Sequence, residues 1–166
     1  DLSLPHKCML ITQTYVGQDT QCIKHLSPKS WDYLINHAEK LDLRKSSIYS
    51  NAPRFSMFGV GDYTFSPWKI VISGLYKNLI FNKIGLYQGK PIVVDDTCYL
   101  LGFEEENQAV LVLQLLQSDV CQKFIESIVF KDNKRPITVS LLNRINLSKI
   151  SEKLPVNNKL PLTNLI

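Results

Sequence analysis

WKIVISGL, residues 68–75, carries the strongest strand signal in the chain. Its apolar run is nearly continuous, which is typical of a strand at the centre of a sheet. Residues 79–84 follow as a predicted partner strand, and residues 91–103 (PIVVDDTCYLLGF) predict either another strand pair or one bent strand. We therefore expect a sheet with residues 68–75 in its middle.

On the N-terminal side, residues 7–14 (KCMLITQT) predict a strand, and residues 21–24 predict a second short strand after a turn. A helix is predicted to begin at Ser27-Pro28, with Ser27 as N-cap and Pro28 at the first position, and to end near Arg44. Apolar residues at steps of three and four predict one buried stripe along it: Trp31, Leu34, Ile35, Ala38 and Leu41.

Three further helices are predicted in the C-terminal half. The first, residues 108–116, places four apolar residues inward: Ala109, Val112, Leu113 and Leu116. Ser118 caps the second, whose apolar face consists of Val120, Phe124, Ile125 and Ile128. Residues 136–144 form the third. Strands and helices that do not alternate strictly predict the α+β class, with a mixed, mostly antiparallel β-sheet and flanking helices. We expect one domain over residues 1–150 and an extended tail over residues 151–166.

The cysteines and the apolar runs exclude several classes of protein. Cys8, Cys22, Cys98 and Cys121 are scattered, with no CxxC pair and no histidine at ligand spacing, so neither a zinc site nor a disulfide framework is expected. No apolar run reaches the length of a membrane span, and residues 1–6 lack the features of a signal peptide. We expect a cytoplasmic protein with reduced cysteines and no membrane partner. Since the chain starts at Asp1, we also expect a domain of a larger protein.

No catalytic or metal motif is found. Phe58-Gly59-Val60-Gly61-Asp62 has two glycines, lacks the third of a dinucleotide fingerprint, and precedes a strand instead of opening a helix. Asp95-Asp96 has the composition of a nuclease metal site, but adjacent residues on a strand point to opposite faces. We expect this acidic pair to bond nearby turn amides, and metal-dependent cleavage is the weakest of three functional hypotheses.

The charges are distributed unevenly although the net charge is only +4. Nine lysines and arginines fall between Lys29 and Lys90 against four acids, and a second basic cluster follows at residues 131–135. The acids concentrate between Asp95 and Glu126. Such a distribution is typical of a domain that shows one positive face to a polyanion, although a solvated surface gives a similar pattern.

Residues 45–67 are predicted to form a long irregular segment, and its aromatic content favours an ordered, functional loop. Basic, hydroxyl and aromatic side chains in and around it can contact phosphates, sugars or bases. Arg44 and Lys45 can equally complement a helix C-terminus, and Lys134 and Arg135 can equally be solvated. The candidate DNA-binding residues are Arg44, Lys45, Ser46, Ser47, Tyr49, Arg54, Ser56, Tyr63, Lys69, Lys77, Lys134 and Arg135.

The run RKSSIYSNAPRFSMFGVGDYTFSPWKIVISGLYK (residues 44–77) resembles the C-terminal part of large bacterial N6-adenine DNA methyltransferases of restriction-modification type. GKPIVVDDTCYLLGF and KRPITVSLLNRI match the same proteins in order, so the resemblance covers roughly residues 4–150. Residues 115–118 read LLQS where the family has LLNS, a departure in an element that looks structural. The resemblance implies a TaqI-like specificity domain with a target-recognition-domain fold, which grips duplex DNA opposite a separate catalytic domain.

The first hypothesis is therefore a DNA-binding specificity domain of an S-adenosylmethionine-dependent, adenine-specific DNA methyltransferase. Its expected partners are double-stranded DNA and the N-terminal methyltransferase domain of the same protein. No cofactor is expected in this segment, because the Asn/Asp-Pro-Pro-aromatic motif and the Gly-rich cofactor turn of such enzymes do not occur in it. The rival hypothesis is an interdomain docking or scaffold domain with little base readout, in which the aromatic loop is the interface.

Overall fold

The computed structural model of the chain describes residues 7–154. Its backbone contacts divide the chain into two compact units, residues 1–64 and residues 65–166. We call them the N-terminal unit and the C-terminal unit, and each is described by itself. Their boundary, after Thr64, falls inside the range 1–150 that the sequence suggested as one domain.

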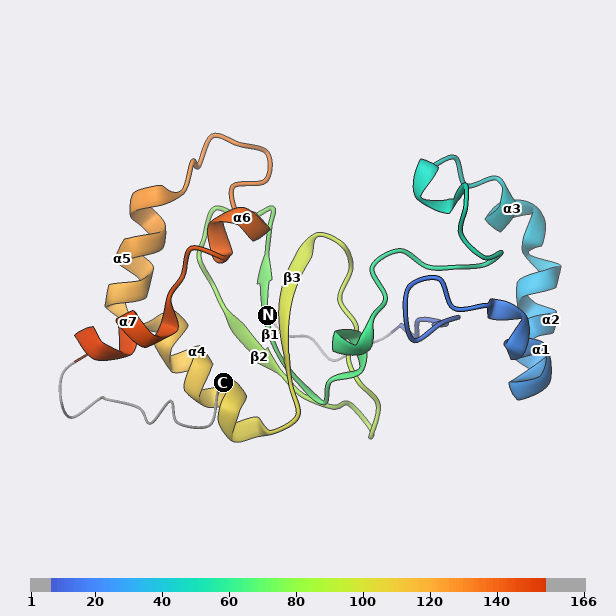
Figure 1. Ribbon diagram of the computed structural model, residues 1–166, viewed down its shortest axis with the longest axis horizontal. Coiled ribbons are helices and arrows are strands. Elements are labelled where there is room, and N and C mark those ends of the chain that lie inside the picture. The colour runs from blue at the N-terminus through green and yellow to red at the C-terminus, as the bar shows by residue number, and fades with distance from the viewer. Residues whose placement is uncertain (1–6, 155–166) are drawn as a thin grey trace. The chain divides into compact units, whose positions relative to one another are not determined.

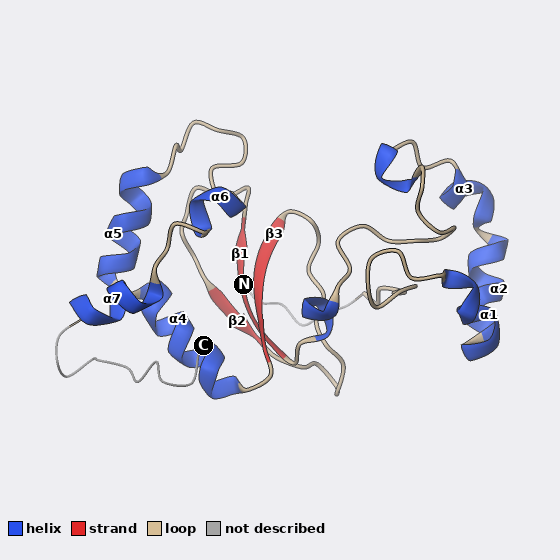
Figure 2. Ribbon diagram, in the orientation of Figure 1, coloured by secondary structure: helices blue, strands red, loops and turns tan. Residues whose placement is uncertain are grey.

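A three-stranded antiparallel sheet forms the centre of the C-terminal unit (Figure 2). Strand β1 (Trp68–Ser73) lies between β2 (Asn82–Ile84) and β3 (Cys98–Phe103), with Lys69 opposite Ile84 on one side and Gly102 on the other. The prediction that WKIVISGL is a central strand is confirmed. The mix of this sheet and flanking helices also confirms the α+β class.

Helix α4 (Glu106–Gln117) packs against all three strands, and α5 (Asp119–Ile128) and α7 (Leu147–Lys153) pack against α4 and against each other (Figure 1). Helix α6 (Val139–Leu142) is a single turn. Ser118 caps α5 as predicted, because its side-chain oxygen accepts a hydrogen bond from the Cys121 backbone N–H at 3.3 Å. The helices thus form a layer on the sheet, with α4 next to the strands.

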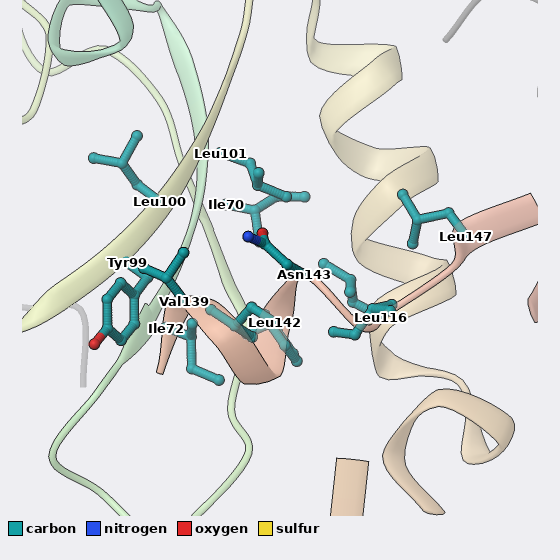
Figure 3. Close-up of a pocket in the computed structure, with 12 residues that line it drawn as sticks. Ile70, Ile72, Tyr99, Leu100, Leu101, Leu116, Val139, Leu142, Asn143 and Leu147 are labelled. Carbon is teal, nitrogen blue, oxygen red and sulfur yellow. The ribbon is translucent and has the colours of Figure 1, made fainter. Parts of the chain in front are cut away.

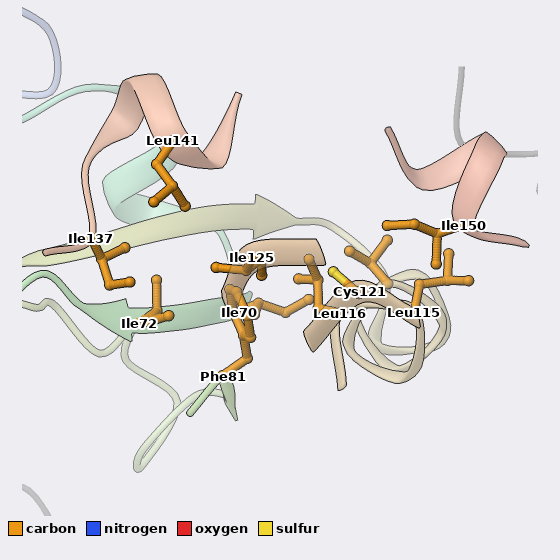
Figure 4. Close-up of a cluster of buried hydrophobic side chains, with 11 residues drawn as sticks. Ile70, Ile72, Phe81, Leu115, Leu116, Cys121, Ile125, Ile137, Leu141 and Ile150 are labelled. Carbon is orange, nitrogen blue, oxygen red and sulfur yellow. The ribbon is translucent and has the colours of Figure 1, made fainter. Parts of the chain in front are cut away.

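The hydrophobic core lies between the sheet and this helical layer (Figure 4). Ile70 and Ile72 are two residues apart on β1 and so point to the same face, where they join Leu115, Leu116 and Ile125. Burying one such side chain fully stabilises the fold by roughly 1.5–3 kcal/mol. The predicted inward residues Ala109, Val112, Leu116 and Ile125 are buried, and so are Leu115 and Cys121, which were not predicted.

The described part of the N-terminal unit contains helices and no strand. The 3-10 turn η1 (Thr20–Cys22) leads into α1 (Ile23–Leu26), which is followed by α2 (Pro28–Asn36) and α3 (Ala38–Asp42). Residues 45–67 are irregular apart from two short 3-10 helices, η2 (Ser47–Tyr49) and η3 (Asp62–Phe65). The prediction of a long irregular segment over residues 45–67 is confirmed.

Several predicted elements were wrong. Residues 7–14 form no strand, and the side chains of Thr12 and Gln13 bond to another loop. Residues 21–24 lie in η1 and α1. The helix predicted from Ser27 to Arg44 is broken at His37, and only Leu34 of its stripe is buried, while Ile35 is exposed. Ser27 occupies the N-cap position of α2 without a side-chain cap bond.

The C-terminal half also differs from the prediction in places. Only residues 98–103 of the predicted 91–103 segment are strand. Helix α7 was not predicted, and it extends through Lys153 into the segment expected to be an extended tail. The rest of that predicted tail, residues 155–166, lies outside the described residues. Within residues 7–154, no helix is long and apolar enough to cross a membrane.

Candidate nucleic-acid interface

The backbone of residues 54–57, which we call the 54–57 loop, is held by side chains instead of by a strand ladder. The hydroxyl of Thr12 donates to the Phe55 carbonyl at 2.8 Å, and the hydroxyl of Thr20 donates to the Arg54 carbonyl. The amide oxygen of Gln13 accepts from the Met57 N–H at 3.1 Å. Thr12, Gln13 and Thr20 are all buried, so they form a polar interior that fixes this loop.

Arg44 ties the end of α3 to the same loop. Its Nε donates to the Leu41 carbonyl at 2.8 Å, and its Nη1 donates to the Ser56 carbonyl at 2.7 Å. The guanidinium also stacks over the ring of Tyr49, with Cζ 3.9 Å from the ring centroid. Arg44 therefore bonds the C-terminal end of α3, as considered from the sequence, and it also contacts the 54–57 loop. Two of its five N–H donors are bonded to protein carbonyls.

Arg54 keeps its guanidinium on the surface. The group contacts the carboxylate of Asp42, with Nη2 2.6 Å from Oδ2, and it lies over the Phe55 ring with Cζ 4.7 Å from the centroid. The hydrogen bond from Arg54 lowers the pKa of Asp42, and the carboxylate in turn raises the pKa of Arg54. Arg54 is therefore a permanent surface cation that already binds one oxyanion.

Lys45 and Ser46 lie between α3 and η2, Ser47 is the first residue of η2, and all three are exposed. The Ser46 side chain caps η2 by accepting from the Ile48 N–H at 3.4 Å, which leaves its hydroxyl hydrogen available. Tyr49 is half-buried beneath Arg44. This short segment therefore offers one cation and two hydroxyl groups to a partner, and Arg44 anchors its start.

Ser56 and Tyr63 are placed differently from each other. Ser56 is 3% exposed, and its hydroxyl has no hydrogen-bond partner among the residues described, so its side chain belongs to the interior of the loop. Tyr63 is exposed, and its hydroxyl donates to the Gly59 carbonyl at 2.8 Å. Tyr63 therefore remains a candidate contact. The buried hydroxyl of Ser56 does not reach a partner on the surface, so we remove Ser56 from the set of candidate contacts.

Lys69 needs a correction. It lies on the central strand β1, is 1% exposed, and donates from Nζ to the Ser66 carbonyl at 2.6 Å. Burial lowers the pKa of its ammonium. A side chain so enclosed does not reach a phosphate on the surface, so we remove Lys69 from the set of candidate contacts. The prediction assumed that a lysine lies on the surface, but both faces of β1 are buried around Lys69.

Lys77, Lys134 and Arg135 are exposed in the C-terminal unit. Arg135 faces Asp96, with Nη2 3.8 Å from Oδ2, and its Nη1 donates to the Asp96 carbonyl at 3.5 Å. The expectation that the acidic pair bonds turn amides is confirmed for Asp95, whose Oδ1 accepts from the Thr97 N–H at 2.9 Å. The hydrogen bond from the Thr97 hydroxyl, together with the one from the Thr97 N–H, lowers the pKa of Asp95. These three cations are candidate phosphate contacts.

The candidates thus separate into groups. Within the N-terminal unit, the segment 44–49 and the 54–57 loop are brought together by Arg44 and by the Arg54–Asp42 pair. Lys77, Lys134 and Arg135 lie in the other unit. Sequence reasoning missed Thr12 and Gln13, because a hydroxyl or amide within an apolar, β-branched run is typical of an ordinary strand residue. It missed Thr20 because this residue lies in a predicted turn.

A pocket in the described residues is not part of this surface. It has a volume of about 390 Å³ and lies in the C-terminal unit (Figure 3). Apart from Tyr99 and Asn143, its lining is apolar: Ile70, Ile72, Phe81, Leu100, Leu101, Leu116, Val139, Leu142, Ile145 and Leu147. None of the candidate DNA-binding residues lines it. Residues 7–154 also contain no group of three or more His, Cys, Asp or Glu side chains that suits a metal ion.

Comparison with known proteins gives one informative relationship. Over 144 residues the chain is 50% identical to the Type II methyltransferase M.NspV of Nostoc sp. (strain ATCC 29411 / PCC 7524), and this match covers 87% of the chain. The chain is similar to part of a Type II methyltransferase. It spans 30% of the length of that relative, so most of the relative has no counterpart here. No protein family and no solved structure matches the chain.

Proposed function

We propose that this chain is the part of an adenine-specific DNA methyltransferase that binds duplex DNA and reads the target sequence. The observation that carries the proposal is the surface of the N-terminal unit, where exposed Lys45, Ser46 and Ser47 adjoin a fixed loop bearing Arg54. Cations neutralise phosphates and hydroxyls reach phosphates or base edges. Similarity to a Type II methyltransferase supports this assignment.

The proposal places methyl transfer, and the S-adenosylmethionine that supplies the methyl group, outside this chain. The sequence contains no Asn/Asp-Pro-Pro-aromatic motif and no G-x-G-x-x-G run. The N-terminal methyltransferase domain of the same protein is the proposed partner. Under this proposal, residues 7–154 bind the DNA and select its sequence, and the partner domain catalyses methyl transfer.

Salt dependence tests the proposal. Contact with about three to five phosphates gives a slope of log affinity against log salt of about −2.7 to −4.5. The full-length protein is titrated into a labelled 30-base-pair duplex (an arbitrary length of about three helical turns) over a series of salt concentrations. We expect a slope in this range, and we expect it to become less steep when Lys45 is replaced by Ala. An affinity that is independent of salt would overturn the proposal.

A docking function is the second candidate, because apolar side chains flank the same segment. Leu43, Ile48 and Phe58 are 69%, 51% and 57% exposed, and apolar side chains that are exposed together are typical of interaction sites. Under this alternative, Leu43→Ser and Phe58→Ser weaken association between this chain and the methyltransferase domain, while Lys45→Ala has no effect on DNA binding. Measuring both properties for the same variants separates the two functions.

A further inference from the structure

We propose that Thr12, Gln13, Thr20 and Arg44 are positioning residues that determine sequence preference without touching DNA, by holding the 54–57 loop in one preformed shape. The inference rests on the proposed function and deepens it. Four consecutive residues each have a backbone group bonded by one of these side chains: Arg54 O, Phe55 O, Ser56 O and Met57 N.

The four bonds come from separate parts of the chain. Thr12 and Gln13 lie in the irregular N-terminal segment, Thr20 lies in η1, and Arg44 follows α3. Their sequence separations from the loop run from 12 to 44 residues, so the bonds are tertiary and not local turn contacts. A backbone without a strand ladder obtains its hydrogen bonds in this way, and every bond restricts the loop further.

The backbone at Phe55 supports this view. Its φ of +66° lies in the left-handed region, which a bulky side chain rarely adopts. The ring is nevertheless 2% exposed and packs edge-on against Trp31, with the ring centroids 5.6 Å apart. Such a conformation persists only where the surroundings determine it fully, and they do so at this loop. The loop is therefore held before any partner arrives.

A fixed loop improves discrimination between bases. Arg44 joins the loop to the segment that carries the exposed Ser46 and Ser47, and exposed Phe58 follows the loop directly. Discrimination between bases needs such side chains to be positioned to within a fraction of an ångström. If the loop is allowed to move, the exposed cations still find phosphates, because phosphate contacts tolerate displacement. Base preference is then lost while salt-dependent affinity is retained.

Isosteric changes test the inference without altering charge. Thr12→Val and Thr20→Val remove the two hydroxyl donors, Thr12→Ser and Thr20→Ser retain them, and Thr14→Val is the matched control because the Thr14 hydroxyl bonds Gln18 and not the loop. Each variant of the full-length protein selects from a pool of 30-base-pair duplexes with a randomised centre, and the bound DNA is sequenced. Thermal unfolding identifies a temperature at which every variant is folded.

We expect the valine variants to lose at least about fivefold in preference at one or more base positions, the scale of a single base contact. The serine variants and Thr14→Val should keep the wild-type preference, and all should keep the wild-type salt slope. Faster amide exchange at Met57 should accompany the loss. Valine variants that are folded and select the wild-type sequence would overturn the inference. If the wild-type protein binds the pool without salt dependence, the proposed function falls, and the inference falls with it.

Discussion

The guanidinium of Arg54 is bound to the carboxylate of Asp42 through three contacts, Nε to Oδ1 and Oδ2 at 3.2 Å each and Nη2 to Oδ2 at 2.6 Å. Both side chains are about half exposed, at 52% and 46%. An ion pair this accessible contributes little to folding stability. Its arrangement is, however, the one in which a guanidinium binds a phosphate, so the carboxylate occupies a position that a DNA phosphate is proposed to take.

Asp42→Asn is expected to strengthen duplex binding, because it removes a competing anion and releases Arg54. Glu39→Gln is the matched control, since it removes the same charge from the same helix α3 without an ion pair in the described structure. The salt slope of Asp42→Asn should be steeper than that of Glu39→Gln by about one phosphate contact. Equal slopes for the two variants, measured by fluorescence anisotropy, would exclude Arg54 as a contact.

Arg44→Ala and Lys45→Ala should separate an effect on folding stability from an effect on DNA contact. Loss of the Arg44 bonds to Leu41 and Ser56 is expected to lower the free energy of unfolding by about 1.5–3 kcal/mol. Lys45 is exposed, so its removal should leave stability unchanged and reduce the salt slope by about one. Chemical denaturation and duplex titration of both variants check this. The assignment fails if Lys45→Ala is the destabilised variant.

Cys121 is expected to be unreactive in the folded protein. It is fully buried in the core, and burial raises the pKa of its thiol to about 11. A raised thiol pKa stabilises the fold below the reference pKa of 9.0, and this contribution is lost as the pH rises through about 11. At pH 8, iodoacetamide should modify exposed Cys8 and spare Cys121 until the protein is unfolded. Mass spectrometry of the peptides would reveal early alkylation of Cys121, which would contradict a closed core.

Lys69 should make stability depend on alkaline pH. Its pKa is lowered by burial, so the folded state releases this proton before the unfolded state does. The wild-type free energy of unfolding should therefore rise, relative to that of Lys69→Met, as the pH increases through the lowered pKa toward 10.5. Denaturation of both proteins between about pH 8 and 10.5 measures the difference. A difference that stays constant over this range would show that the ammonium is solvated.

The C-terminal unit was largely predictable from the sequence. WKIVISGL identified the central strand, and apolar spacing identified α4 and α5 with most of their buried residues, because in these elements hydrophobic periodicity and tertiary packing agree. Helix α7 was missed because its short sequence LSKISEK has only two apolar residues.

The N-terminal unit was not predictable in the same way. KCMLITQT has the composition of a strand, but Thr12 and Gln13 use their side chains to bond a loop more than forty residues away. Such pairings depend on tertiary geometry, which leaves no periodic signal. The same limitation affected the candidate site: Arg44 and Lys69 were identified by charge, whereas their partners, the carbonyls of Ser56 and Ser66, are backbone atoms that every residue possesses.

Photo-crosslinking from position 47 tests the central claim most directly. Ser47 is exposed beside Lys45, and a photoreactive phenylalanine derivative placed there reports what the surface touches. Glu126, exposed on α5, serves as the control position. In the full-length protein with duplex DNA, we predict that position 47 crosslinks to DNA and position 126 does not. Crosslinking of position 47 to the rest of the protein, with no DNA adduct, would contradict the account and favour a docking surface.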